Sequence, residues 1–476
     1  MAGAVGFGGY YKRPHPPPPP PMSHREHRLV RLGREMRVSL VLALPLVLGQ
    51  LAAMLMSVVD SLLAGRYGVH TLAAVTVGSS IWNVALFVCV GVMLAVPPSV
   101  AQLNGAGRRG EIGPLWRQAL WIALPLGLLL AVAVWFSPVL LDTIGIVEEV
   151  RPQATQFLRA IAAGAPALMV YIALRYLSEG LAWTPPTMVF GLAGLVVLAP
   201  LGYALMYGAG PLPELGARGL GLATAIVLWL QAAAFALYLW RSPRFADLGL
   251  FARWERPDFH QIRALLALGL PMGVSIFMEG SLFVATALLI GRIGAVDVAA
   301  HQIALNVASV CFMLPLGIAM ATTVRVGHAA GAGDRPAMRR AAGAGFALGG
   351  LTQALAGAIL VFGGATIAGW YTDDAAVAGL AVLLMLYAAV FQLPDGIQVL
   401  SAGALRGLKD TRVPMLITVF AYWGVGLPLG AWFGLHLGRG APGLWIGLIL
   451  GLSVAAVLLA LRLWRQLHPL PRAGVT

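Results

Sequence analysis

Three carboxylates lie inside long apolar segments of the chain, where an ionised side chain is costly. They are Asp60 in Val-Val-Asp-Ser, Glu279 in Phe-Met-Glu-Gly, and Asp395, which directly follows a proline. A carboxylate at bilayer depth must be neutral, paired or hydrated. Burial disfavours the charged form, so such an acid can hold a proton near neutral pH, and its oxygens can alternatively bind a small cation. We therefore predict that these three acids bind H⁺ or Na⁺, with Na⁺ possible at Glu279 and Asp395.

The spacing of nearby arginines indicates the depth of the first two acids. Asp60 precedes Arg66 by six residues, which is about 9 Å along a helix, so it lies in the outer part of its segment. Pairing with Arg66 is the alternative role for this acid. Glu279 follows Arg263 by sixteen residues and precedes Arg292 by thirteen, so it lies near the middle.

Asp395 combines depth with a helix-disrupting neighbour. It precedes Arg406 by eleven residues, about 16 Å along a helix. Pro394 removes a backbone donor and frees the carbonyl four residues back. A loosened helix beside an acid is a feature of transporter ion sites, and a kink with a structural acid is the alternative.

Other polar residues are weaker candidates. Arg175 and Glu179 have the i,i+4 spacing of a structural ion pair. Four further side chains could line a cavity or bond one helix to another, and they are Gln302, Asn306, Phe391 and Gln392.

The composition places these residues in a membrane protein. Of 476 residues, 59% are hydrophobic and 11% are charged, whereas a soluble chain carries about 25% charged residues. A spanning helix needs about 20 apolar residues. Twelve such segments lie near 38–64, 72–99, 116–140, 154–178, 186–207, 219–240, 264–291, 296–324, 341–369, 377–405, 413–435 and 443–464.

The lysines and arginines orient these segments. If the N-terminus is cytoplasmic, 25 basic residues fall on the cytoplasmic side and 6 on the other. Cytoplasmic loops are enriched in Lys and Arg, so we expect both termini in the cytoplasm. The net charge of +13 is then a topology signal, and we expect no nucleic-acid partner.

The two halves of the chain repeat each other at a shift of 226 residues. Gly65-Arg66-x-Gly68 aligns with Gly291-Arg292-x-Gly294, and Gly105-Ala106-Gly107 with Gly331-Ala332-Gly333. Six spans return the chain to its starting side, so the halves share one orientation. The expected fold is an all-α membrane protein of twelve transmembrane helices, in two six-helix bundles related by a pseudo-two-fold axis along the membrane normal.

The predicted divisions follow from this repeat. They are a disordered Pro-rich and basic cytoplasmic tail at 1–37, an N-terminal bundle at 38–240, a cytoplasmic linker at 241–263, a C-terminal bundle at 264–465 and a cytoplasmic tail at 466–476. Residues 16–21 are all proline, and we suspect that Met22 is the true start.

The acids break the repeat. Positions equivalent to Asp60, Glu279 and Asp395 hold Thr286, Ala53 and Met169. A purely structural acid would more often appear in both halves, so the halves are expected to have specialised.

Several motifs resemble the MATE (multidrug and toxic compound extrusion) family, in its bacterial NorM-like branch. The resemblance covers residues 38 to 465 and is carried by residues 59–65, 100–105, 213–216, 299–302, 325–328, 403–407 and 409–410. It implies an antiporter of the bacterial inner membrane that exports organic cations, dyes and fluoroquinolone-like drugs in exchange for a cation. It also implies that acids matching Asp60, Glu279 and Asp395 act in coupling or substrate binding.

Two departures from the NorM-like pattern favour H⁺ over Na⁺ as the coupling ion. Phe391 stands where a tyrosine often precedes the tenth-span acid, and Leu198 and Gly202 stand where two asparagines often flank a proline. Each change removes a possible Na⁺ ligand and leaves the acids for a proton.

The main alternative is a lipid-linked oligosaccharide flippase of the same superfamily. A flippase needs a cationic cavity for a pyrophosphate headgroup, and this sequence puts acids rather than arginines at depth. An enzyme is disfavoured because no nucleophile–base pair or metal cluster appears in the sequence. We expect small cationic substrates, a surrounding lipid bilayer, no cofactor besides the coupling ion, and function as a monomer.

Overall fold

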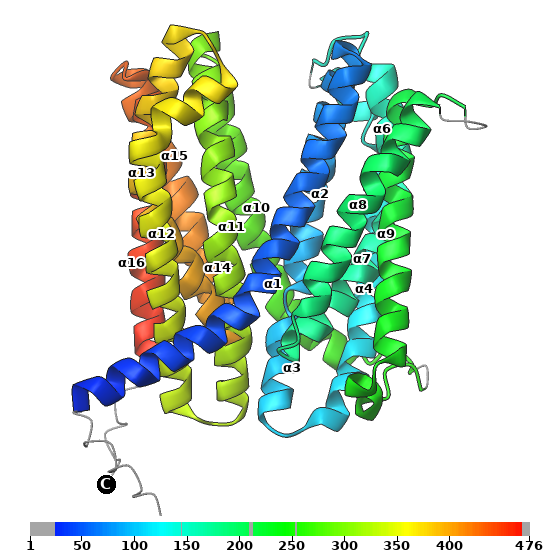
Figure 1. The fold of residues 1–476 in the computed structure, drawn as a ribbon, viewed down its shortest axis with the longest axis vertical. Helices are drawn as coiled ribbons and strands as arrows, with labels where there is room; N and C mark the ends of the chain where they lie inside the picture. The colour runs from blue at the N-terminus through cyan, green and yellow to red at the C-terminus, as the bar shows by residue number, and fades with distance from the viewer. Residues whose placement is uncertain (1–23, 144, 209–212, 253–254, 469–476) are drawn as a thin grey trace, which may run out of the picture.

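The computed structural model describes residues 24–143, 145–208, 213–252 and 255–468, and these residues form helices and connecting loops with no strand. The helices gather into two bundles that lie side by side (Figure 1). We call residues of α1 to α9 the N-lobe and residues of α10 to α16 the C-lobe. The face where α1 begins and α16 ends is the termini face, and the opposite face is the distal face.

The helices of the N-lobe are α1 (His24–Tyr67), α2 (Val69–Met93), α3 (Val96–Gly105), α4 (Ile112–Phe136), α5 (Val139–Thr143), α6 (Arg151–Ala162), α7 (Ala165–Gly180), α8 (Pro185–Tyr207) and α9 (Gly216–Arg241). Those of the C-lobe are α10 (Phe259–Ile290), α11 (Ala295–Gly331), α12 (Arg335–Tyr371), α13 (Ala375–Gly407), α14 (Arg412–Val419), α15 (Leu427–Ala431) and α16 (Gly440–Leu467). Two π-helical segments, η3 (Phe420–Gly426) and η4 (Trp432–His436), flank α15.

The number of spans agrees with the predicted twelve-helix fold. In the described residues, eleven helices are long and apolar enough to cross a bilayer, and a pair bent by 45°, α6 with α7, supplies a twelfth. The bent pair coincides with the predicted span 154–178. The prediction of an all-α protein with two six-span halves is therefore confirmed.

One difference between the halves follows from prolines. The second span of the N-lobe divides into α2 and α3 just before Pro97 and Pro98. The equivalent positions in α11 hold Thr323 and Val324, and α11 runs unbroken. Proline lacks a backbone donor and clashes with the preceding turn, so it ends or kinks a helix.

Close contacts between the lobes repeat with the sequence. A Cβ added to Gly105 would lie 1.9 Å from the His328 carbonyl oxygen, and one added to Gly331 would lie 2.0 Å from that of Gln102. Gln102 and Gly105 precede His328 and Gly331 by 226 residues each, so the two contacts are exchanged by the pseudo-two-fold axis. Gln102 also donates a hydrogen bond of 2.8 Å to the Gly407 carbonyl. Together these contacts join the lobes at the termini face.

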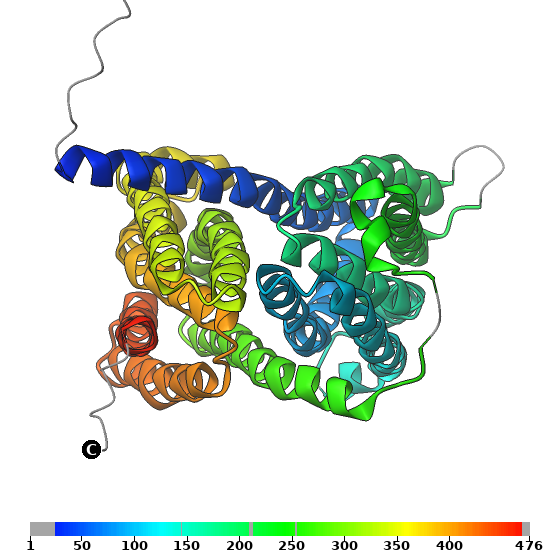
Figure 2. The same cartoon turned by 90° about the horizontal axis from the view of Figure 1, so that it is seen from below.

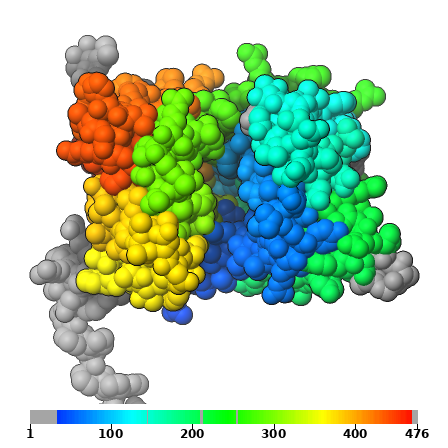
Figure 3. All heavy atoms as spheres, turned by 90° about the horizontal axis from the view of Figure 1, so that it is seen from above, coloured from blue at the N-terminus to red at the C-terminus, as the bar shows by residue number. Residues whose placement is uncertain are grey.

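Away from the termini face the lobes diverge. Their helices separate towards the distal face (Figure 1), and the molecule is hollowed between the lobes when it is viewed from that face (Figure 3). The structure therefore presents a single conformation, joined at one face and open towards the other.

The start of α1 corrects one prediction. Residues 1–37 were expected to be a disordered tail, but α1 begins at His24 and continues into the first span; residues 1–23 lie outside the described residues. The first turns of α1 extend over the C-lobe before the helix joins the N-lobe (Figure 2). Basic residues are good helix formers, and tertiary contacts add to this preference.

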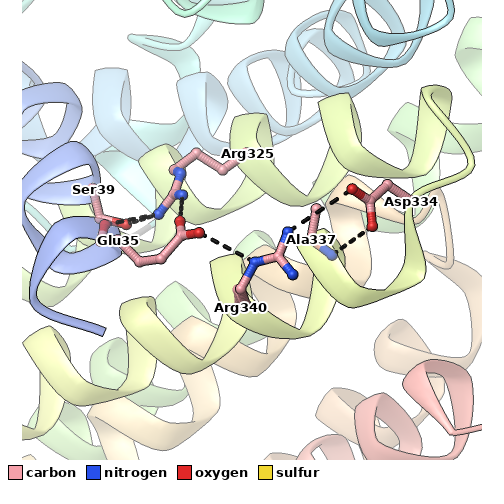
Figure 4. Close-up of polar contacts among 6 residues, drawn as sticks. All are labelled: Glu35, Ser39, Arg325, Asp334, Ala337 and Arg340. Carbon is pink, nitrogen blue, oxygen red and sulfur yellow. Dashed lines mark hydrogen bonds and ion pairs between the residues drawn. The ribbon is translucent and has the colours of Figure 1, made fainter. Parts of the chain in front are cut away.

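Those contacts centre on Glu35. Its carboxylate pairs with Arg325 of α11 and, at 3.2 Å, with Arg340 of α12 (Figure 4). Arg325 also donates to the Glu35 carbonyl at 3.0 Å and to the Ser39 hydroxyl. The first span of one lobe is thereby anchored to two helices of the other.

The predicted linker at 241–263 packs against the N-lobe where it is described. Arg117 of α4 pairs with Glu255 at 2.6 Å, and Gln118 donates to the Arg256 carbonyl at 3.1 Å. Asp258 caps α10 by accepting from the His260 amide at 2.9 Å. The chain enters the C-lobe from this anchored segment.

Candidate functional site

A cavity of about 560 Å³ lies between the two lobes. A volume of this size suits a drug-sized ligand. Apolar and aromatic side chains from both lobes dominate its walls. Its polar lining residues are Gln50, Arg175, Tyr176, Ser275, Gln231, Glu279, Gln398, Arg406, Asp410, Thr411 and Thr418.

Glu279 of α10 lines this cavity and is half-buried. The helix is held close to the N-lobe at this level, because a Cβ on Gly280 would lie 2.6 Å from the Phe87 ring of α2. The predicted acid is thus placed where a molecule between the lobes would meet its carboxylate.

Asp395 lies in the C-lobe beyond the cavity wall. Its side chain is 3% exposed, and it interacts electrostatically with Glu279. Tyr422 of η3 interacts electrostatically with both acids. The Tyr422 hydroxyl and both amide atoms of Gln392 are buried and have no hydrogen-bond partner within the described residues. Buried polar groups usually have partners, so this cluster could hold a proton or a small cation.

The helix carrying Asp395 continues through Pro394 without a break. The expected loosening of the helix is therefore not seen as an interruption. Asp395 falls on the same helical stripe as Val399, Ala402 and Arg406, at steps of four, three and four residues. Those three residues line the cavity, so Asp395 lies one helical turn beyond the part of α13 that lines it.

Asp60 is isolated from the other two acids. It is 8% exposed, and its Oδ1 has no hydrogen-bond partner among the described residues. The alternative pairing with Arg66 is not formed in the described part of the chain, because Arg66 belongs to no ion pair there. Around Asp60, α1 packs on α8, where a Cβ on Gly202 would lie 2.9 Å from Leu63. The structure thus separates a lone N-lobe acid from a C-lobe cluster.

The predicted ion pair of Arg175 and Glu179 is confirmed. Arg175 Nε lies 2.6 Å from Glu179 Oε1. Arg175 also donates to Gln50 of α1 at 3.0 Å, and Thr187 of α8 donates to Glu179 at 2.9 Å. The pair is buried and ties three N-lobe helices together.

The four predicted cavity-lining residues do not line this cavity. Gln302 donates to Asn306 at 3.1 Å, one turn away on α11. Phe391 packs on Trp445 and Phe283 inside the C-lobe, with ring centroids at 6.0 and 6.2 Å. Gln392 is 1% exposed, and its carbonyl accepts from Gln353 of α12 at 2.7 Å. Gln302 and Asn306 lie on α11, and Phe391 and Gln392 lie one turn before Asp395 on α13, beyond the part of that helix that lines the cavity.

Three side chains of the site were not predicted as such. Phe391 carries no hydroxyl for the region of Asp395, but Tyr422 of η3 supplies one there. It was missed because it comes from a different helix. Gln353 reaches the same region from α12. Arg406 lines the cavity together with Arg175, so the expectation that acids alone occupy the inner positions is wrong. For each of these three side chains, the signal available in the sequence was a polar residue inside an apolar segment.

Comparison with known proteins gives consistent matches along the chain. A family model described as MatE matches residues 45–204 and 271–432. A protein of Xanthomonas axonopodis pv. citri named "Probable multidrug resistance protein NorM" is 57% identical over 442 residues, covering 93% of this chain and 96% of that protein. "Multidrug resistance protein PmpM" of Pseudomonas aeruginosa is 42% identical over 444 residues, covering 92% and 93%.

Solved structures share the fold at lower identity. The eukaryotic MATE transporter AtDTX14 superposes with a TM-score of 0.85 at 19% identity, covering 92% of this chain and 98% of that one. An outward-facing multidrug resistance MATE family transporter superposes with a TM-score of 0.83 at 19% identity, covering 91% and 96%.

Proposed function

Because this chain belongs to the MATE family of transporters, to which the MatE matches in both lobes assign it, we propose that it exports drug-like organic cations. The support from relatives is that long, closely similar bacterial proteins are named for multidrug resistance. The support from the structure is a drug-sized cavity between two lobes, with an acid in its wall. Export rather than catalysis is the activity that this arrangement fits.

We place the termini face in the cytoplasm of a bacterium and the protein in its inner membrane. The 25-to-6 distribution of basic residues supports this orientation. The distal face, towards which the lobes diverge (Figure 1), then faces outward. Substrate released from this conformation would leave the cell.

Alternating access is the proposed mode of transport. Two similar bundles around a central site can rock against each other. The paired contacts of Gly105 and Gly331 support closure at the termini face, and opening that face would require the two contacts to separate. The bilayer surrounds a unit with its cavity inside one chain, so we propose a monomer as the working form.

The observation that carries the mechanism is the position of Glu279 in the cavity wall, with the buried Asp395 one helical turn beyond the residues of α13 that line the cavity. Two acids that repel each other favour uptake of a proton by one of them. A cationic substrate at Glu279 competes with that proton, so binding of one expels the other. Export is thereby exchanged for proton entry, and a potential of 100 mV contributes about 2.3 kcal/mol per charge moved.

Protons are preferred over Na⁺ for a structural reason at Asp60. Asp60 Oδ1 has no hydrogen-bond partner among the described residues. Near it α1 packs through Leu63 on the part of α8 that holds Leu198 and Gly202, neither of which carries a side-chain oxygen. Hard cations require several oxygen ligands, whereas a proton requires one. At Asp395 the Tyr422 hydroxyl offers a second oxygen, so the argument is weaker there. The mechanism needs no resident cofactor besides the coupling ion.

A flippase remains the second candidate because Arg406 gives the cavity one unneutralised cation. Arg175 does not add to it, since Glu179 neutralises it at 2.6 Å. Because Glu279 also lines the cavity, the cavity is close to neutral rather than cationic, and a pyrophosphate headgroup needs several cations. Drug export therefore fits better.

The test is dye transport in everted membrane vesicles with imposed pH or Na⁺ gradients. We expect a pH gradient alone to drive uptake, and Asp395→Asn to reduce its rate by at least about tenfold, since the amide cannot exchange a proton at neutral pH. Asp374→Asn is the matched control on the same helix. Asp374 caps α13 by accepting from the Ala376 amide at 2.8 Å, and asparagine caps equally well.

Transport driven by Na⁺ and not by pH would overturn proton coupling. Unchanged transport in Asp395→Asn would overturn the assigned site. Absence of transport of any cationic dye by the wild-type protein would overturn drug export itself.

A further inference from the structure

Arg406 is a cation in the cavity wall for which the described residues supply no ion-pair partner. It is half-buried near the end of α13, and its Nε makes one hydrogen bond, to the Ala402 carbonyl at 3.3 Å. Within the described residues it forms no ion pair. A guanidinium has five donors in a planar fork, so most of its donors point to no protein acceptor.

At the equivalent positions of the N-lobe, a cation and an acid neutralise each other. At the shift of 227 residues that aligns Gly180 with Gly407, Arg406 corresponds to Glu179 and Ala402 corresponds to Arg175. The N-lobe therefore has a paired cation and acid, whereas the C-lobe keeps one cation alone. Buried charges are costly when unpaired. An unpaired arginine in a ligand cavity suggests that its partner arrives with the ligand.

The surroundings of Arg406 fit one end of a ligand. Glu279 and Arg406 both line the cavity and form no ion pair within the described residues, so one part of its wall is negative and another is positive. Near the positive end lie Tyr176 and Thr411, together with Asp410, whose carboxylate is paired with Arg462 at 2.7 Å. Further along α13, a buried Gln398 Oε1 has no hydrogen-bond partner among the described residues. Aromatic rings line the apolar walls between the two ends, and they are those of Phe87, Tyr171, Phe283 and Phe312.

We propose that Arg406 forms an anion subsite that binds the carboxylate of amphoteric substrates, with their basic amine towards Glu279. Arginine binds a carboxylate through two parallel hydrogen bonds, which are stronger than neutral ones. A flat aromatic molecule with an amine at one end and a carboxylate at the other satisfies both walls at once. This rests on the proposed export function and adds to it a specificity-determining residue.

The competing role for Arg406 is to hold Glu279 ionised through the cavity. In that case, loss of Arg406 would weaken every substrate that uses Glu279, whether or not it has a carboxylate. In the proposed role, only substrates with a carboxylate would be affected. A matched ligand pair separates the two.

The experiment measures dissociation constants with purified protein in detergent, from tryptophan fluorescence. The ligands are a fluoroquinolone carboxylic acid and its ethyl ester, which keeps the ring and the amine but is a monocation. We expect Arg406→Gln to weaken binding of the acid by about tenfold and of the ester by less than about twofold. Arg406→Lys keeps the charge without the fork and should weaken binding of the acid by an intermediate factor.

Arg412→Gln is the control for charge at the same end of the lobe, because Arg412 is exposed at the start of α14. It should leave both constants unchanged. Equal weakening of acid and ester by Arg406→Gln, or wild-type binding of neither ligand, would overturn the subsite. If Arg406→Gln does not fold, Arg406→Lys is used instead. A ratio of acid to ester dissociation constants equal to that of the wild type would then overturn the subsite. Export itself is tested by transport in vesicles. Selective binding without transport would therefore overturn only the proposed function.

Discussion

In the N-lobe the inner end of the fourth span holds Arg175 and Glu179 as a closed pair at 2.6 Å. In the C-lobe the equivalent positions hold Ala402 and Arg406, and the cation faces the cavity. The acids differ as well. Asp60 Oδ1 has no hydrogen-bond partner in the described part of the chain, whereas Asp395 interacts electrostatically with Glu279 and Tyr422.

The difference shows how a duplicated fold divides its work. The backbone contacts that join the lobes are kept in both halves, because each half must fit the other. The charged side chains are free to diverge, since a helix tolerates many residues at one position if its partners also change. One lobe thus gained a structural pair, and the other gained most of the groups that face a ligand.

Replacing Glu179, the acid of the N-lobe ion pair, should give the largest effect on stability. Glu179→Gln keeps an oxygen that can accept from Arg175 but removes the negative charge that neutralises it, and breaking a buried ion pair costs about 3–5 kcal/mol. Arg406→Gln should cost much less, because no ion pair is lost. Thermal unfolding in detergent compares the two variants. Similar losses of stability would mean that the lobes do not differ in the way described.

Matching substitutions at the two equivalent contacts between the lobes should have similar effects. Gly105→Ala and Gly331→Ala each place a methyl group against a backbone carbonyl at 1.9 or 2.0 Å, and overpacking of this kind costs about 1–3 kcal/mol. We expect both to destabilise the closed termini face to a similar extent, with slower dye transport. Gly343→Ala is the control, because its Cβ would meet nothing within 4 Å, and it should be neutral or stabilising. A large effect in only one of the paired variants would contradict the symmetry.

The smallest effect is expected at the edge of the N-lobe. Arg109 bonds to Asp247 at 2.7 Å and holds the pKa of that carboxyl below its usual value of 3.8. An acid with a lowered folded-state pKa contributes stability above its unfolded pKa, and loses it as the pH falls through the folded one.

We therefore expect Asp247→Asn to lower the unfolding temperature slightly at pH 7, and the difference from wild type to shrink as the pH drops below 3.8. The equivalent of Arg109 in the C-lobe is Arg335, which forms no ion pair in the described part of the chain, so Arg335→Gln should change nothing. A difference for Asp247→Asn that persists at low pH would show that the ion pair is not its cause.

Hydropathy, the repeat and the three acids could be found without the structure, because each is a local or periodic property of the chain. A run of apolar residues has to cross the bilayer whatever its neighbours are. The i,i+4 pair of Arg175 and Glu179 was also predictable, since one helix sets its geometry. The helical start of α1 was not, because its contacts through Glu35 with Arg325 and Arg340 join residues almost 300 positions apart.

The sequence by itself determined how many spans there are, how the halves correspond and which residues are costly to bury. Only the tertiary structure decided what those residues face. Asp395 and Tyr422 come from different helices, and Phe391 and Gln392 are buried inside the lobe while Arg406 lines the cavity. A spacing along the chain specifies the angle between side chains on one helix, but the rotation of that helix against its neighbours is set by packing of the whole bundle.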